Sequence, residues 1–308
     1  MADEAPVQRA GFVAVLGRPN VGKSTLLNQV LGTKLSVVTP RPQTTRNRIR
    51  AIHEVPGAQL VFVDTPGIHK PRTELNRAMV DAAWAAMADA DAGVLVVEAV
   101  ELPEGKFAPG AAVEAILERL TSRQLPTVLA INKIDRIPRP ALLPLIDGYR
   151  QAYPFAAIVP ICALTGDGVA TVVQELVPLL PTGDRLFPGD QLSDRAQRFF
   201  VSELIREQVF LQTREEVPYG CAVVIDKYEE ARLAGRRTEI LATIVVDEAR
   251  HRAILVGKGG QQIKALGIAS RQAIETFLEQ PVILKLFVKV RQDWTKTAKD
   301  VRDLGNEP

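Results

Sequence analysis

Short apolar runs alternate with amphipathic stretches through the first 180 residues of the chain. Apolar runs at residues 12–16, 59–63, 127–131 and 157–161, with another ending near Val97, have the length and composition of buried strands. Helix-like patterns lie between them, and this alternation is typical of a parallel sheet covered on both faces. Residues 49–53 predict an additional antiparallel edge strand. The pattern therefore predicts an α/β fold with a doubly wound, mostly parallel sheet.

A segment rich in proline and glycine, residues 178–190, interrupts this pattern and predicts a linker. We assign residues 1–10 to a tail, 11–180 to a first domain, 181–192 to the linker and 193–308 to a second domain. The second domain begins with an apolar-faced helix, for which Ser193 or Asp194 is the expected cap. Strands are expected at 220–228, 239–246 and 282–290, with helix-forming segments on both sides of residues 257–260 and a further helix at about 270–278. This order predicts a smaller α+β domain.

Composition places the chain among ordinary soluble proteins, with 308 residues, 46% hydrophobic and 24% charged. The length favours about two domains. Two cysteines provide no disulfide framework, so a reducing cytosol is the expected compartment. The N-terminal residues lack the apolar core of a signal peptide, and no apolar run reaches the length of a membrane span.

The charge of the chain is unevenly divided, although the net charge is only +2. Residues 1–184 contain 18 Lys and Arg against 18 Asp and Glu, whereas residues 250–299 contain 10 against 3. Such a basic stretch is often just a solvated face, but it is also the expected footprint of a nucleic-acid backbone.

Residues 17–24, GRPNVGKS, match the phosphate-loop pattern G-x-x-x-x-G-K-[ST] between a strand and a helix. Its glycines let backbone N–H groups surround a phosphate, Lys23 supplies charge to the β- and γ-phosphates, and Ser24 can bind Mg²⁺. A glycine-rich turn that binds nothing is the minor alternative. The predicted nucleotide-binding residues here are Gly17, Arg18, Pro19, Asn20, Val21, Gly22, Lys23, Ser24 and Thr25.

Residues 132–135, NKID, follow a predicted strand and indicate which base is bound. The Asp135 carboxylate can accept both adjacent donors of guanine, whereas adenine presents an acceptor at the same place. Asn132 suits the N7/O6 edge, and the Lys133 stem can lie over the ring. Because these residues follow a parallel strand, where α/β sheets bind ligands, guanine is favoured over adenine.

Residues 64–67, DTPG, follow another strand and predict the γ-phosphate and magnesium side. Asp64 is expected to hold Mg²⁺ through water, and the Gly67 N–H to approach the phosphate. Residues 40–46 would be the first switch, in which Thr44 or Thr45 completes the metal shell; we favour Thr45. A plain turn and an ordinary polar loop are the alternatives. The predicted metal set is Ser24, Thr45 and Asp64, and the DTPG set is Asp64, Thr65, Pro66 and Gly67.

The basic C-terminal stretch holds a G-x-x-G loop between helix-forming segments. Missing side chains at such a loop let a nucleic-acid backbone come close, and Lys258 can pair with phosphate. Residues 286–288 are predicted as strand core rather than a base-stacking platform, and Trp294 either packs on the sheet or stacks on bases. The predicted RNA-binding residues are Gly257, Lys258, Gly259, Gly260, Ile263, Lys264, Lys289 and Arg291.

GRPNVGKS, PQTTR, DTPG and NKID, in this order, resemble the translation-factor-related GTPases, and especially the Era family. The order helix–strand–strand–helix–helix–strand around G-x-x-G resembles a type II KH domain, and this pair of domains is the Era architecture. In the family a fifth motif, Ser-Ala-Leu, contacts guanine; here it is Cys162, Ala163 and Leu164.

Two positions bear on the rate of hydrolysis that the resemblance implies. Ile68 stands where Ras-like enzymes carry the glutamine that orients water, so the intrinsic rate is expected to be slow. Asn20 occupies the position where related GTPases coordinate potassium, and we favour that role; stabilisation of the loop is the alternative. The predicted catalytic residues are Lys23, Asn20 and Thr45, with Mg²⁺ and K⁺ as cofactors.

The resemblance implies a molecular switch that converts GTP to GDP and phosphate and binds the 3′ end of 16S ribosomal RNA and the 30S subunit, assisting small-subunit maturation. It also implies a cytoplasmic, monomeric protein, with peripheral membrane association as a tendency of the family. A structural RNA-binding module that uses GTP as a stability cofactor is the alternative. An RNA-modification GTPase is disfavoured, because its catalytic cysteines and cofactor domains are not visible.

Overall fold

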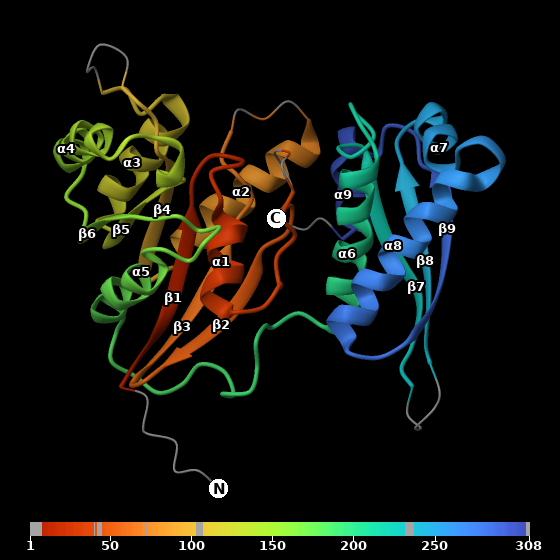
Figure 1. Cartoon of the computed structure of the whole chain (residues 1–308), viewed down its shortest axis with the longest axis horizontal. Coiled ribbons are helices and arrows are strands. Elements are labelled where there is room, and N and C mark those ends of the chain that lie inside the picture. The colour runs from red at the N-terminus through yellow and green to blue at the C-terminus, as the bar shows by residue number, and fades with distance from the viewer. Residues whose placement is uncertain are drawn as a thin grey trace, which may run out of the picture.

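Two lobes of different architecture lie side by side in the computed structural model, joined by an extended linker that passes below the first lobe and rises to the start of the second (Figure 1). The structure describes residues 8–39, 41, 45–69, 71, 73–102, 107–231 and 237–305. The first lobe holds the predicted nucleotide motifs and the second holds the basic stretch. Within the described part of the chain, no helix has both the length and the hydropathy that a membrane crossing requires.

The first lobe is built on one six-stranded sheet in the order β2-β3-β1-β4-β5-β6. All neighbouring strands are parallel except β2 and β3, which confirms the mostly parallel sheet and its antiparallel edge strand. The strands are β1 Arg9–Leu16, β2 Ile49–Val55, β3 Ala58–Asp64, β4 Ala92–Glu98, β5 Thr127–Asn132 and β6 Ala157–Pro160.

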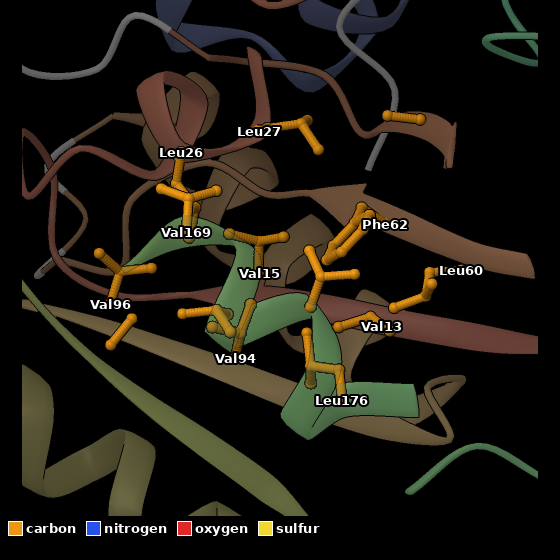
Figure 2. Close-up of a cluster of buried hydrophobic side chains, with 14 of the residues drawn as sticks. Val13, Val15, Leu26, Leu27, Leu60, Phe62, Val94, Val96, Val169 and Leu176 are labelled. Carbon is orange, nitrogen blue, oxygen red and sulfur yellow. The ribbon is translucent and has the colours of Figure 1, made fainter. Parts of the chain in front are cut away.

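Helices cover both faces of this sheet, and alternate side chains of each strand enter two separate cores. Val13 and Val15 of β1 pack beneath α1 and α5, as Figure 2 shows, whereas Ala14 and Leu16 pack toward α2, α3 and α4. Because both faces are buried, the inner strands β1, β4 and β5 are apolar along most of their length, whereas the edge strand β2 carries charged side chains. The helices are α1 Lys23–Leu31, α2 Glu74–Ala88, α3 Ala111–Arg123, α4 Leu142–Ala152 and α5 Val169–Leu176, with short turns η2 Ile134–Arg136, η3 Arg139–Ala141 and η4 Val177–Leu179.

The second lobe packs three helices on one face of a three-stranded sheet, β7-β8-β9. Strands β7 and β8 are antiparallel and β8 and β9 are parallel, with the G-x-x-G turn between α7 and α8 in the crossover. This confirms the KH-type order of elements. They are α6 Gln197–Gln212, β7 Cys221–Glu229, β8 Thr238–Val246, α7 Ala249–Val256, η5 Lys258–Gly260, α8 Gln261–Leu278, β9 Val282–Val290, η6 Trp294–Lys296 and α9 Ala298–Asp303.

Two local predictions in the second lobe are wrong. Helix α6 is preceded by Ala196 and has no side-chain cap; Ser193 instead donates to the Arg50 carbonyl and Asp194 pairs with the Arg50 guanidinium. The separate helix expected from about residue 270 is the second half of α8, which runs without a break from Gln261 to Leu278. Leu266, Ser270 and Ile274 form one buried stripe at four-residue spacing, and its packing carries the helix past Gly267.

Trp294 is fully buried, which settles its two alternatives in favour of packing. Its indole N–H donates to the Gly220 carbonyl over 2.9 Å. The ring joins a hydrophobic cluster between the lobes, which we call the interlobe cluster. Its buried members are Leu75 and Met79 of α2, Ala222 and Val245 of the second sheet, Trp294, and Val301 of α9.

Candidate functional site

Four nucleotide motifs, at residues 17–24, 64–67, 132–135 and 162–164, converge on one cavity of about 330 Å³ at the carboxyl edge of the first sheet. Loops after β1, β3, β5 and β6 meet there because parallel strands end at a common edge. Of the predicted nucleotide-binding residues, Gly17, Arg18, Val21, Asp64, Thr65 and Pro66 are not among those lining it. The lining is Pro19, Asn20, Gly22, Lys23, Ser24, Thr25, Val37, Val38, Thr39, Arg41, Thr45, Gly67, Asn132, Lys133, Asp135, Arg136, Cys162, Ala163 and Leu164.

Lys23 lies at the end of the cavity where the phosphates are predicted to bind. Its Nζ donates to the carbonyl oxygens of Gly17, over 3.2 Å, and Arg18, over 3.0 Å. Burial lowers the pKa of Lys23 to about 8, and the nearby Asp64 acts in the opposite direction. A phosphate at this place would give the buried ammonium an anionic partner and favour its charged form.

Two glycines let the loops approach each other closely. Gly22 has a φ of +101°, and a Cβ there would lie 2.2 Å from the Asn132 side-chain nitrogen. A Cβ on Gly67 would lie 2.5 Å from the backbone nitrogen of Pro19. The DTPG turn therefore contacts the phosphate loop directly, backbone against backbone, and no larger residue fits at either position.

Three oxygen-bearing side chains form the predicted metal side. Ser24 Oγ donates to Asp64 Oδ2 over 3.0 Å and lies 2.9 Å from Thr45 Oγ1, which is 3.4 Å from the same carboxylate oxygen. The other oxygen, Asp64 Oδ1, is buried without a hydrogen-bond partner, and burial raises the pKa of this carboxyl group. This all-oxygen set suits Mg²⁺. The alternative ligand Thr44 lies outside the described residues.

At the opposite end, Asp135 presents its exposed carboxylate to the cavity and accepts a contact of 3.3 Å from Cys162 Sγ. Asn132 is bonded at both ends of its amide: its nitrogen donates to the Val21 carbonyl over 2.8 Å, and its oxygen accepts from Ala163 N–H over 2.9 Å. We predicted Asn132 to face the guanine edge. In the structure it ties the phosphate loop to the fifth motif, and so holds the two ends of the cavity at a set separation.

The two residues expected to govern the rate lie in different surroundings. Ile68 is buried in the core beneath α2, α3 and α4, and an apolar side chain there has no group that orients water. Asn20 lines the cavity with a left-handed backbone, φ +67°. Asparagine tolerates that conformation better than other non-glycine residues, so its backbone geometry also agrees with the loop-stabilising alternative.

The G-x-x-G turn presents open backbone between α7 and α8. Gly257, Gly259 and Gly260 all have positive φ, and a Cβ on Gly259 would meet no atom within 4 Å. Lys258 and Lys264 are exposed beside it, and Ile263 packs partly against the core of the lobe. These six residues therefore form one contiguous surface.

The structure places Lys289 and Arg291 on the other face of the sheet. Val288 and Val290 pack toward the core under α6, α7 and α8, so the odd-numbered residues of β9 point away from these helices. Arg291 forms ion pairs with Asp300 and Asp303 of the α9 region. These two cations are thus separated from the G-x-x-G surface by the sheet.

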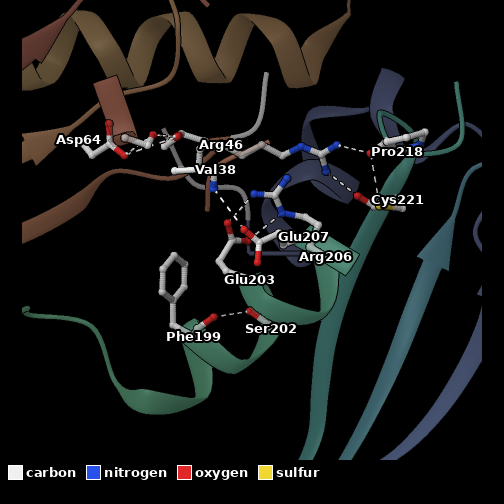
Figure 3. Close-up of polar contacts among 12 residues, drawn as sticks. Val38, Arg46, Asp64, Phe199, Ser202, Glu203, Arg206, Glu207, Pro218 and Cys221 are labelled. Atoms are coloured by element: carbon white, nitrogen blue, oxygen red, sulfur yellow. Dashed lines mark hydrogen bonds and ion pairs between the residues drawn. The ribbon is translucent and has the colours of Figure 1, made fainter. Parts of the chain in front are cut away.

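Polar contacts between the lobes were missed by the sequence analysis. Arg46 of the first lobe enters the second, and Glu207 of α6 accepts hydrogen bonds from Lys34 and Val38 beside the nucleotide cavity (Figure 3). The sequence held one signal for a buried polar interface. It was a set of charged residues on the otherwise apolar face of α6: Glu203, Arg206 and Glu207.

Family models match both lobes. The model of the 50S ribosome-binding GTPases matches residues 12–133, and the model of the KH domain matches residues 216–295. GTPase Era of Geobacter metallireducens is 46% identical over 297 residues, covering 96% of this chain and 97% of the relative. GTPase Era of Syntrophus aciditrophicus is 44% identical, covering 96% and 95%.

Solved structures agree with these relatives over the whole length. Era of Aquifex aeolicus, in a variant bound to GDP and AlF₄⁻, superposes with a TM-score of 0.90 at 37% identity, covering 97% of this chain and all of that one. Era in complex with MgGDPNP and nucleotides 1506–1542 of 16S ribosomal RNA gives the same TM-score and identity, covering 98% and 100%. With relatives of this identity over nearly the whole chain, a phosphate loop and a C-terminal KH lobe, the chain belongs to the Era family of GTPases.

Proposed function

We propose that this GTPase is a molecular switch that binds the 3′ region of 16S ribosomal RNA and the 30S subunit and assists small-subunit assembly and maturation. The supporting observation is that one chain joins a converged nucleotide cavity to an open G-x-x-G surface through buried contacts. A relative of the same architecture has been solved with both MgGDPNP and a 16S fragment.

In this proposal Lys23 binds the β- and γ-phosphates, and the phosphate-loop N–H groups complete the anion site. Ser24 and Thr45 bind Mg²⁺ directly and Asp64 binds it through water; the ion, when bound, offsets the charge of the phosphates. Asp135 accepts the N1–H and amino group of guanine. Potassium at Asn20 would offset charge between the β- and γ-phosphates, and the buried Ile68 keeps the intrinsic rate slow.

On the second lobe, Gly257–Gly260 would admit the RNA backbone, with Lys258 and Lys264 pairing with phosphates and Ile263 lining the groove for bases. Lys289 and Arg291 remain predicted contacts, reached only if RNA passes around the edge strand β9. We place the protein in the cytoplasm as a monomer, and the proposal requires no membrane association.

A binding titration tests the switch. A labelled oligonucleotide with the 3′ sequence of 16S RNA is titrated with full-length protein carrying GDP, a GTP analogue or no nucleotide, at one salt concentration. We expect the RNA affinity to differ between nucleotide states, and by linkage the RNA must shift nucleotide affinity by the same factor. Equal RNA affinity in all three states would contradict a switch while leaving RNA binding intact.

The burial of Ile68 also favours a second candidate, a structural RNA-binding module in which GTP stabilises the fold and hydrolysis is incidental. Small-subunit assembly in a depleted extract separates the two. A switch requires turnover, so protein supplied with a non-hydrolysable analogue should bind particles and fail to leave them. Full assembly with the analogue would favour the structural module.

A further inference from the structure

One arginine of the first lobe is buried inside the second. Arg46 is only 3% exposed. Its Nη1 donates to the Cys221 carbonyl (Figure 3). Its Nη2 donates to the Pro218 carbonyl over 3.0 Å and to the Tyr219 carbonyl over 2.9 Å. Its guanidinium lies 6.0 Å from the centroid of the Trp294 ring. Three carbonyl acceptors on one turn match the rigid fork of an arginine, so the side chain has one well-defined position.

The neighbouring residue faces the opposite way, into the nucleotide site. Thr45 Oγ1 lies 2.9 Å from Ser24 Oγ and 3.4 Å from Asp64 Oδ2, the oxygens of the proposed metal side. Consecutive Cα atoms are about 3.8 Å apart, so a backbone fixed at Arg46 is also fixed at Thr45. The anchor in the second lobe and the metal side of the first are therefore one residue apart.

The other end of the same loop is held by the second lobe as well. We call residues 38–46 the switch segment; its described members are Val38, Thr39, Arg41, Thr45 and Arg46, with residue 47 onward leading into β2. The Val38 N–H donates to Glu207 Oε1 over 3.3 Å, and Lys34 Nζ pairs with Glu207 Oε2 over 2.5 Å. Four of the described members line the nucleotide cavity.

We propose that Arg46 is a positioning residue of the GTPase site, through which the KH lobe holds Thr45 at the oxygens of Ser24 and Asp64. The inference rests on the role of Thr45 proposed above. Without the anchor, the end of the switch segment that carries Thr45 would have to be ordered by the nucleotide, at the entropic cost of fixing its backbone. A shift of the turn that carries Pro218, Tyr219 and Cys221 would equally displace Thr45, so partners of the KH lobe reach the GTPase site by this path.

The test uses full-length protein with Arg46→Ala, Arg46→Lys, Thr45→Ala and the double variant Thr45→Ala/Arg46→Ala. The measurements are kcat, the Mg²⁺ concentration for half-maximal hydrolysis at saturating GTP, and GDP affinity. We expect Arg46→Ala to lower kcat or raise the Mg²⁺ requirement by about 10–100-fold, as the loss of a residue that orients a metal ligand does. GDP affinity should change by less than about 2-fold, because Lys23 and Asp135 remain. Arg50→Ala is the matched control: its side chain is 46% exposed and pairs with Asp194 outside the cavity.

The double variant distinguishes positioning from general stabilisation. If Arg46 acts through Thr45, Arg46→Ala has no further effect in the Thr45→Ala background. Multiplying effects on kcat would overturn the inference and leave Arg46 a packing residue. A clear effect of Thr45→Ala with none of Arg46→Ala removes the inference and keeps the proposed function; no effect of Thr45→Ala removes the proposed role of Thr45 and the inference with it.

Arg46→Lys keeps the test decisive if the alanine variant does not fold. Lysine retains the cation but cannot reproduce the fork toward three carbonyls, so an intermediate loss of kcat is expected, with the same shift in Mg²⁺ requirement. A lysine variant with wild-type kcat and Mg²⁺ requirement would contradict the positioning role.

Discussion

At the scale of single residues, the predicted guanine end of the cavity depends on the exposed carboxylate of Asp135. Cys162 contacts Asp135 Oδ1, and Asn132 forms hydrogen bonds with both Val21 and Ala163. These contacts restrict the conformation of the loop that carries the carboxylate. Cysteine at residue 162 is a weaker donor than the serine typical of the family. The hydrogen bonds of Asn132 therefore help to fix the backbone that carries Asp135.

Asp135→Asn should exchange the preferred base. An amide replaces one of the two acceptor oxygens by a donor, so guanine loses a charge-assisted hydrogen bond and faces a second donor. We expect GDP affinity to fall about 100-fold or more, and xanthosine diphosphate, which carries a carbonyl in place of the amine, to bind better than GDP. Calorimetric titration of both nucleotides measures this, and unchanged GDP affinity would show that Asp135 does not read the base.

Asn20 allows a separation of its two possible roles. Glycine adopts the φ of +67° without strain, so Asn20→Gly keeps the loop and removes the amide. If the amide binds potassium, wild-type turnover should be about tenfold or more higher in KCl than in NaCl at equal ionic strength, and Asn20→Gly should lose this difference. GDP affinity serves as the control for loop integrity. Equal wild-type rates in the two salts would remove the potassium role.

At the scale of elements, functional groups gather where regular structure ends. The nucleotide loops follow β1, β3, β5 and β6, and the G-x-x-G turn separates α7 from α8. On β9, by contrast, side chains alternate between the helix-covered face and the opposite face. Lys289 and Arg291 share the odd-numbered face, and this strand parity is the reason they lie away from Lys258.

The α7–α8 turn should carry the electrostatic part of RNA binding. We expect Lys258→Ala and Lys264→Ala each to weaken RNA affinity and to reduce the slope of log affinity against log salt by about 0.7, the value for one phosphate contact on a single strand. Lys299→Ala, an equal charge change at an exposed position of α9, is the control. Anisotropy titrations at several salt concentrations measure the slopes, and identical slopes in all three variants would place the RNA elsewhere.

At the scale of the whole molecule, the two lobes share both a polar and an apolar contact. Arg46 and Glu207 carry the polar one beside the nucleotide cavity. The interlobe cluster carries the other, with Leu75 and Met79 of α2 against Trp294. Since α2 follows the DTPG turn and Arg46 ends the switch segment, each of the loops predicted to sense the γ-phosphate is connected to the KH lobe.

We expect Leu75→Ala to weaken the apolar contact between the lobes and so lower the stability of the protein. Leu75 is 4% exposed, and truncation of a buried leucine typically lowers the free energy of unfolding by about 2–4 kcal/mol. Leu143→Ala on α4 is the matched control, because that side chain is 66% exposed and should change the free energy of unfolding by less than about 0.5 kcal/mol. Urea unfolding measures both. A loss for Leu75→Ala as small as that of the control would show that the interlobe cluster contributes little to stability.

The sequence by itself determined the strand and helix order of both lobes, and the identity of the nucleotide motifs. Each motif lies within a few residues along the chain, directly after an apolar strand, so local backbone geometry and the common edge of a parallel sheet were enough to bring the motifs together. Two predictions made from local signals, a helix cap at residues 193–194 and a helix break before residue 270, were wrong because tertiary packing overrode those signals.

Only the tertiary structure decided which side chains from distant segments meet. Arg46 and Cys221 are 175 residues apart, Asn132 and Val21 are 111 apart, and Trp294 is 74 from its acceptor Gly220. No periodicity or motif encodes such pairs, because they form only when distant segments pack together and a buried polar group must find a partner. The residue types of the nucleotide site are therefore set by short local motifs. Its connection to the KH lobe arises from packing between distant parts of the chain.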